Sequence, residues 1–291
     1  MVKHDAVQVS GRVFDKSGWL IVIGGLISLY GPTYWDLAHS LWRNDEEFHG
    51  AIVLVVAGWL VMRPESHLLS GPCVPVNGWG TVLLTIGLFL YLLGRSQEIL
   101  LFEVGSQIPV FAATLLLMHG FSSLRAARFA LFFLIFMLPL PGILIDSLTG
   151  PLKQWISYGV EHILYDLGYP IARQGVVLSV GQYQLLIADA CSGLGSMFSL
   201  AAMGLLFMHL IARPGITYKG IMLASIVPIA FLANMARVVA LVLVTYYFGD
   251  DAGQGFMHRF AGMLLFISAL SGFFFLDFIL SHLIIDNPVS T

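Results

Sequence analysis

Residues 218–249, YKGIMLASIVPIAFLANMARVVALVLVTYYFG, decide the fold class of this chain. Only two side chains in the stretch carry a charge, Lys219 and Arg237. Because an apolar run of roughly 20 residues is enough for a helix to cross a bilayer, the stretch predicts a transmembrane helix. Arg237 lies inside that helix, where a charge costs free energy, and it therefore marks a candidate functional position.

The composition of the whole chain favours the same class. Of the 291 residues, 58% are hydrophobic and 11% are charged, whereas roughly a quarter of the residues in a soluble domain are charged. The formal net charge of -3 argues against nucleic acid as a partner. Two cysteines are too few for a disulfide scaffold. The chain is predicted to be a polytopic membrane protein in contact with lipid.

Hydropathy predicts an all-α bundle of eight spans in a single domain, residues 1–291. The first span is expected to stay uncleaved, because no small-residue cleavage site follows it. Pro139 and Pro141 are expected to bend the fifth span. The predicted spans are Gly18–Trp35, Phe48–Met62, Gly78–Gly94, Ile99–Gly120, Phe129–Ile145, Cys191–Ala212, Tyr218–Gly249 and Phe260–Ile285.

The distribution of Lys and Arg between loops predicts the orientation, with both termini in the cytoplasm. Residues 146–190 then form an insertion on the outer side. Within it, Pro151–Gly168 has helical periodicity and predicts an amphipathic helix lying in the membrane interface. Val176–Val180 and Tyr183–Ile187 flank Gly181-Gln182, which predicts a short hairpin leading to the sixth span.

Cys191 opens the sixth span in the sequence Ala190-Cys191-Ser192-Gly193. A cysteine is most often a small buried hydrophobe. At the first turn of a helix, however, unpaired N–H groups and the positive end of the helix dipole stabilise a thiolate. Ser192 and Gly193 would let a substrate backbone approach closely. Cys191 is therefore a candidate nucleophile.

Arg237 and His258 are predicted to lie near the membrane–water boundary on the outer side, as Cys191 is. Arg237 either snorkels to the headgroups or faces the bundle and binds an anion or an oxyanion. Asn234 lies three residues earlier on the same helix face and can bind the same group. His258, just before the eighth span, is either a solvated interfacial residue or a group that exchanges protons with the thiol.

The remaining polar residues have weaker signals. His49 could line the same candidate site as Cys191, or it could simply be a solvated residue at a helix end. Glu103 could pair with Arg95 or with Arg237. Asp277 and His282 are expected to snorkel at the inner end of the last helix. No spacing typical of a metal site or a phosphate-binding loop occurs, so neither a metal nor a cofactor is expected.

At these residues the chain resembles the exosortase/archaeosortase family of multipass membrane cysteine enzymes. The matching pieces are Ala190-Cys191-Ser192-Gly193, Asn234-x-x-Arg237 and His258 followed by Gly262. Weaker matches upstream are His49-Gly50, Pro139-Leu140-Pro141 and the Gly181 turn.

The resemblance implies a cysteine protease or transpeptidase in the bacterial inner membrane, with Cys191, Arg237 and His258 as its catalytic residues. It implies exported substrates with a carboxy-terminal tail, made of a Pro-Glu-Pro motif, a transmembrane helix and a basic end. It also implies an association with exopolysaccharide production. The alternative is a transporter or polysaccharide-export component that binds an anionic ligand at Arg237.

Overall fold

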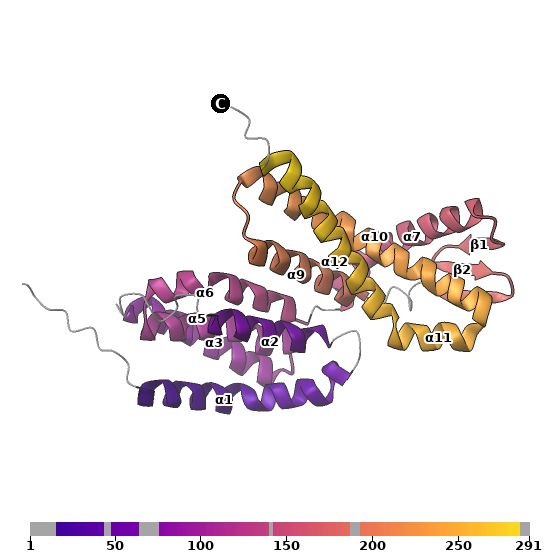
Figure 1. Cartoon of the computed structure of the whole chain (residues 1–291). Coiled ribbons are helices and arrows are strands. Elements are labelled where there is room, and N and C mark those ends of the chain that lie inside the picture. The colour runs from indigo at the N-terminus through magenta and orange to yellow at the C-terminus, as the bar shows by residue number, and fades with distance from the viewer. Residues whose placement is uncertain (1–15, 44–47, 64–75, 140–141, 187–192, 286–291) are drawn as a thin grey trace, which may run out of the picture. The chain divides into compact units, whose positions relative to one another are not determined.

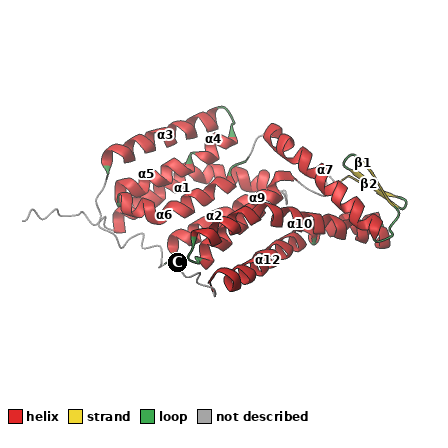
Figure 2. Ribbon diagram, turned by 90° about the horizontal axis from the view of Figure 1, so that it is seen from above, coloured by secondary structure: helices red, strands yellow, loops and turns green. Residues whose placement is uncertain are grey.

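The computed structural model describes residues 16–43, 48–63, 76–139, 142–186 and 193–285 (Figure 1). The described residues are helical nearly throughout, and the strands are confined to one small sheet beside α7 (Figure 2). The chain divides into two compact units, Met1–Leu140 and Pro141–Thr291. The expectation of a single domain stays a prediction.

Every described element of the first unit is a helix. Three glycines of α3, Gly80, Gly87 and Gly94, repeat every seven residues and face the α4–α5 segment, where a Cβ on any of them would meet a neighbouring atom. Small residues at such spacing let two apolar helices pack closely. The helices are α1 (Lys16–His39), α2 (His49–Met62), α3 (Asn77–Ser96), α4 (Leu100–Gly105), α5 (Gln107–Met118) and α6 (Phe121–Phe133), with 3-10 turns at Leu41–Arg43 and Leu134–Met137.

The second unit combines long helices with a three-stranded antiparallel sheet of order β1-β2-β3. Its elements are α7 (Gly142–Asp166), β1 (Ile171–Gln174), β2 (Val177–Val180), β3 (Tyr183–Leu186), α9 (Gly193–Ile211), α10 (Ile216–Phe248), α11 (Asp250–Arg259) and α12 (Ala261–Leu280), and a π-helical turn, Ser281–Ile285, follows.

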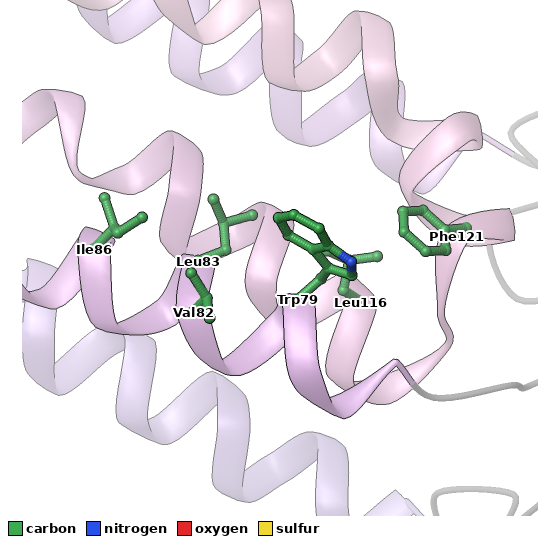
Figure 3. Close-up of a pocket in the computed structure, with 6 residues that line it drawn as sticks. All are labelled: Trp79, Val82, Leu83, Ile86, Leu116 and Phe121. Atoms are coloured by element: carbon green, nitrogen blue, oxygen red, sulfur yellow. The ribbon is translucent and has the colours of Figure 1, made fainter.

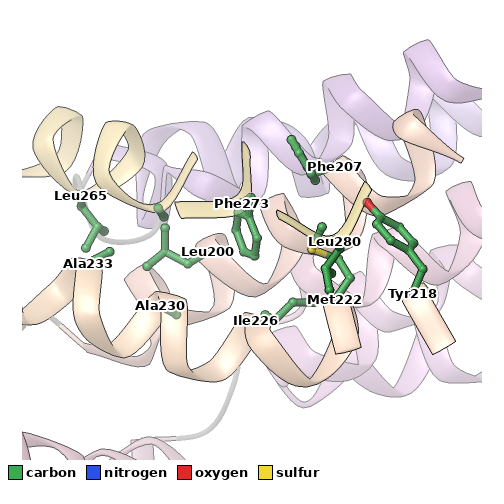
Figure 4. Close-up of a cluster of buried hydrophobic side chains, with 11 residues drawn as sticks. Leu200, Phe207, Tyr218, Met222, Ile226, Ala230, Ala233, Leu265, Phe273 and Leu280 are labelled. Carbon is green, nitrogen blue, oxygen red and sulfur yellow. The ribbon is translucent and has the colours of Figure 1, made fainter. Parts of the chain in front are cut away.

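Two hydrophobic clusters hold this unit together, and α10 takes part in both. One side of α10 packs against α9 and α12 through buried residues such as Ile226, Leu200 and Phe273 (Figure 4). Another side packs against α7 and the sheet through Val238 and Val242. The long helix α10 is therefore the central element of the second unit.

By length and composition, five helical segments in the described residues could cross a membrane. They are Gly18–His39, Asn77–Ser96, Leu100–Met118, Ile216–Phe248 and Ala261–Leu283. Two further predicted spans correspond to shorter apolar helices, His49–Met62 and Met197–Ile211. The protein is an all-α polytopic membrane protein, and the count of eight spans stays a prediction.

The predicted fifth span, Phe129–Ile145, differs most from the structure. The helix α6 begins earlier, at Phe121, includes Arg125 and Arg128, and gives way to a 3-10 turn after Phe133. Residues 140–141 lie outside the described residues. The apolar run from Phe129 onward marked only the end of an amphipathic helix, because the arginines before it occupy the same helix.

The predicted start of the insertion helix at Pro151 is wrong. The helix α7 begins at Gly142 and continues through Pro151 to Asp166. A proline removes one backbone hydrogen bond, and in a membrane protein neighbouring groups can compensate for that loss. Pro32 and Pro228 likewise lie inside helices, α1 and α10.

The apolar face predicted for this helix is divided in the structure. Ile156, Val160 and Leu164 are fully buried against the sheet and α10, whereas Trp155 and Leu167 are each 66% exposed. The helix therefore contributes one apolar stripe to the protein core and presents a second to the surroundings. The second stripe is the one available to a membrane interface.

The segment predicted as a hairpin forms β2 and β3. Val180 lies opposite Tyr183, and Gly181 between them has φ +57°, in the left-handed region that glycine adopts without strain. Strand β1 was not predicted. It pairs antiparallel with β2, with Ile171 opposite Val180.

Candidate active site

The candidate site begins with a buried polar pair in the middle of α10. Arg237 is 5% exposed and Asn234 is 1% exposed. Arg237 therefore does not reach outward as a snorkelling side chain would. The Oδ1 atom of Asn234 is buried and has no hydrogen-bond partner among the described residues. An empty buried acceptor of this kind costs about 1–3 kcal/mol.

The position of Arg237 on the helix surface fixes which neighbours it faces. It follows Ala233 by four residues and Ala230 by seven, which places all three on one stripe of α10. Ala230 and Ala233 belong to the hydrophobic cluster shared with α9 and α12. Arg237 therefore continues the stripe that faces those two helices.

The packing of α9 against α10 shows which part of α9 lies at the same level as Arg237, that is, at the same height along the helix bundle. A Cβ added to Gly204 would lie 2.9 Å from Ile226 Cγ1, so these two residues share one level of the bundle. The helices run in opposite directions because a short turn, residues 212–215, joins them. Arg237 lies eleven residues beyond Ile226, and Gly193 eleven residues before Gly204, about 16 Å in each case. Gly193 and Arg237 are therefore level.

The start of α12 reaches the same level. The added Cβ at Gly204 would also lie 2.6 Å from Phe273 Cζ, and Ala261 precedes Phe273 by about 18 Å of helix. Figure 4 shows the same order, with Leu265 and Ala233 at one end of the cluster and Tyr218 at the other. The beginnings of α9 and α12 thus lie beside the part of α10 that carries Arg237.

His258 is the second-last residue of α11, just before α12. The helix α11 packs against the end of α10, where a Cβ on Gly253 would collide with the hydroxyl of Thr245. A single residue, Gly249 with φ +90°, connects the two helices and turns the chain. The side chain of His258 lies outside the described residues, so its pairing with the thiol stays a prediction.

Cys191 and Ser192 also lie outside the described residues. Gly193, which follows them, is the first residue of α9. The described backbone therefore brings the neighbours of Cys191 and His258 to the level of Arg237. The roles of Cys191, Ser192, Gly193 and His258 stay predictions.

The two other predicted supporting residues belong to the first unit. His49 is the first residue of α2, and Gly50 after it packs so closely that an added Cβ would lie 2.9 Å from Trp42 Nε1. Glu103, 3% exposed, accepts hydrogen bonds from Thr33 Oγ1 at 2.6 Å and from Arg95 Nη1 at 3.1 Å. Of the two partners predicted for Glu103, the structure shows Arg95.

The expectation that Asp277 snorkels is wrong. Asp277 is buried, and Arg213 donates to both of its carboxylate oxygens, Nε to Oδ1 and Nη2 to Oδ2, each at 2.7 Å. The hydroxyl of Tyr218, which is fully buried, donates to Oδ1 at 2.5 Å. These hydrogen bonds raise the pKa of Arg213 further above its usual value. Sequence periodicity missed this triad because Asp277 lies 64 residues from Arg213 and 59 residues from Tyr218.

Metal-binding groups and cavities are the remaining features of the described residues. Among the described residues, no group of three His, Cys, Asp or Glu side chains is placed to hold a metal ion. One pocket in the first unit is lined without any ionisable side chain, by Trp79, Val82, Leu83, Ile86, Leu116 and Phe121 (Figure 3).

Comparison with known proteins gives the family. A family model described as transmembrane exosortase matches residues 41–275. No match was found among the curated proteins or among the solved structures. Exosortases are in general cysteine peptidases or transpeptidases of the membrane. Because the match covers most of the chain, including α9, α10 and α11, this protein belongs to the transmembrane exosortase family.

Proposed function

We propose that the protein is a membrane-embedded cysteine transpeptidase that removes the carboxy-terminal sorting tail of exported proteins. The tail consists of a Pro-Glu-Pro motif, a transmembrane helix and a basic end. The observation that carries the proposal is the packing of Gly204 against Ile226 and Phe273. From this contact, helix rise brings Gly193, Arg237 and Ala261 to about the same height along the bundle.

The first half of the reaction forms a thioester. The Cys191 thiol gives its proton to His258, and the thiolate sulfur attacks the carbonyl carbon of the scissile amide. A C–S bond forms, and the carbonyl electron pair moves to an oxyanion that Arg237 stabilises. When this intermediate collapses, the C–N bond breaks and the His258 imidazolium protonates the leaving amine.

The second half releases the substrate. The acceptor amine or a water molecule attacks the thioester carbon, and neutral His258 takes its proton as the new bond forms. The C–S bond breaks, and the electron pair returns to sulfur as the thiolate. With an amine the product is transferred to the acceptor, and with water the product is simply hydrolysed.

The proposal includes a location. The enzyme lies in the bacterial inner membrane with both termini in the cytoplasm, and the site opens on the periplasmic side. The Lys and Arg residues of the loops support this orientation. The tail then enters the site from the side on which exported proteins emerge.

The test follows tail cleavage by full-length enzyme reconstituted with a tailed substrate. In the Cys191→Ala variant the substrate should remain uncut, whereas Cys73→Ala, which changes the other cysteine, should leave cleavage intact. With wild-type enzyme, mass spectrometry after rapid quenching should find the substrate fragment as a thioester on Cys191.

The rival function predicts a different result. A transporter that binds an anionic ligand at Arg237 forms no covalent adduct and needs no thiol. Cleavage by the Cys191→Ala variant would overturn the transpeptidase proposal. So would a substrate that still carries its tail after incubation with wild-type enzyme.

A further inference from the structure

Asn234 presents a buried hydrogen-bond acceptor that no other described residue engages. Its side chain is 1% exposed, and its Oδ1 atom has no partner among the described residues. Buried polar groups are normally paired, so an empty one calls for an explanation. An apolar residue of the same shape would avoid the cost. The acceptor therefore points to a ligand that brings its own donor.

The place of Asn234 indicates where that ligand lies. It precedes Arg237 by three residues, which is about one turn of α10. Asn234 therefore lies about 5 Å closer than Arg237 to the level of Ile226. Both residues lie on one side of the helix. A chain whose reacting carbonyl sits at Arg237 and which continues into the membrane therefore passes Asn234 next.

The chemistry of the acceptor narrows the ligand further. An amide oxygen accepts a hydrogen bond from an N–H or O–H group, and a lipid phosphate, which is an acceptor, does not satisfy it. The first turn of any helix presents backbone N–H groups that have no partner within the helix. In hydrocarbon such groups cannot turn to water, so they need a protein acceptor.

We infer that Asn234 Oδ1 accepts a backbone N–H from the first turn of the substrate's transmembrane tail helix. The inference rests on the proposed function and adds a specificity-determining residue to it. Asn234 recognises the first turn of the substrate's membrane-embedded helix. This contact aligns the peptide bond that precedes the substrate helix with Arg237.

The test pairs enzyme and substrate variants in the reconstituted reaction. Proline, which has no backbone N–H, replaces each of the first three tail-helix residues in turn, where a helix tolerates it. At one position proline should lower kcat/KM about threefold to tenfold, the effect of one hydrogen bond. Asn234→Leu should cause the same loss with the unaltered tail, and the proline should then cost nothing more.

A thermal-unfolding measurement separates this role from a structural one. Removing an unpaired buried acceptor should leave the unfolding temperature of the Asn234→Leu variant equal or higher, although cleavage falls. Thr245→Val is the matched control, because the Thr245 hydroxyl is also buried on α10 without a partner among the described residues. This variant should keep the wild-type response to proline.

Two results would overturn the inference alone. In the first, the losses of kcat/KM caused by proline and by Asn234→Leu multiply at every tail position, so the two changes act independently. The other is a fall in unfolding temperature that parallels the fall in cleavage. Both leave the transpeptidase proposal standing as long as Cys191→Ala is inactive, whereas cleavage by Cys191→Ala removes the proposed function itself.

Discussion

The two ends of the α9–α10–α12 bundle treat their buried polar groups in opposite ways. At one end Asp277 receives two hydrogen bonds from Arg213 and one from Tyr218. At the other end Asn234 keeps a buried acceptor without a partner among the described residues, one turn from Arg237. Hydrophobic packing of the same three helices connects the two ends (Figure 4).

The difference separates stability from function. A partly buried ion pair whose carboxylate accepts three hydrogen bonds fixes the register of two helices and leaves that carboxylate little capacity for a ligand. A buried group left unpaired weakens the fold but remains ready to bind. Mutations at the first end should therefore change stability, and mutations at the second end should change catalysis.

The largest expected effect is at the end of the bundle that carries Arg237, where the proposed active site lies. Arg237→Lys should lower kcat for tail cleavage by a factor of about 100 or more, because an ammonium does not reproduce the planar donor fork at the oxyanion. The unfolding temperature should stay close to that of wild type, since the charge is kept. A rate assay and a thermal-unfolding scan on the same sample test both parts. Wild-type rates in this variant would remove Arg237 from the mechanism.

Asp277→Asn should produce the reverse pattern. The substitution leaves Arg213 without its counter-charge, and the unfolding free energy should fall by about 2–4 kcal/mol. This loss is at the lower end for buried ion pairs because the Arg213 side chain is 33% exposed. Denaturation in detergent micelles measures this. Tyr218→Phe, which removes a single hydrogen bond, should cost about 1 kcal/mol. A variant that is fully stable but inactive would place Asp277 in the catalytic machinery instead.

Gly204→Ala tests the packing that sets the common level of the site. The added methyl group would overlap Phe273 and Ile226, and such overpacking costs about 1–3 kcal/mol. Gly220→Ala in α10 is the matched control, because its Cβ meets nothing within 4 Å. The control should gain up to about 1 kcal/mol from helix propensity. Equal responses of the two variants in unfolding experiments would contradict the close contact at Gly204.

The smallest effect is a pH dependence that belongs to neither end. His119 is buried in the first unit, its ring 5.5 Å from that of Trp19, and burial lowers the pKa of His119 below its usual 6.5. The folded state therefore favours the neutral ring, and the unfolded chain binds more protons below pH 6.5. Stability should be complete above that pH and decline as the pH falls through 6.5. Unfolding scans across this range should lose the decline in His119→Phe.

The sequence predicted the helical membrane class because apolar length alone decides whether a helix can cross a bilayer. It also singled out Arg237 and Asn234, since polar residues stand out in an apolar helix. It misplaced the start of α7 and the predicted fifth span, because Pro151 lies inside a helix that it was expected to begin, and Arg125 and Arg128 lie in a helix and not in a loop. Local rules for proline and arginine yield when neighbouring elements supply compensating contacts.

The sequence by itself determined which segments are apolar enough to enter a membrane, and it offered Cys191, Arg237 and His258 as candidates for the chemistry. Only the tertiary structure decided which polar groups satisfy one another. Arg213 meets Asp277 across 64 residues, whereas the Oδ1 acceptor of Asn234 stays unpaired within the described part of the chain. The reason is physical: hydrophobicity acts on each segment separately, but a hydrogen bond depends on the distance between two atoms, and helix packing alone sets that distance.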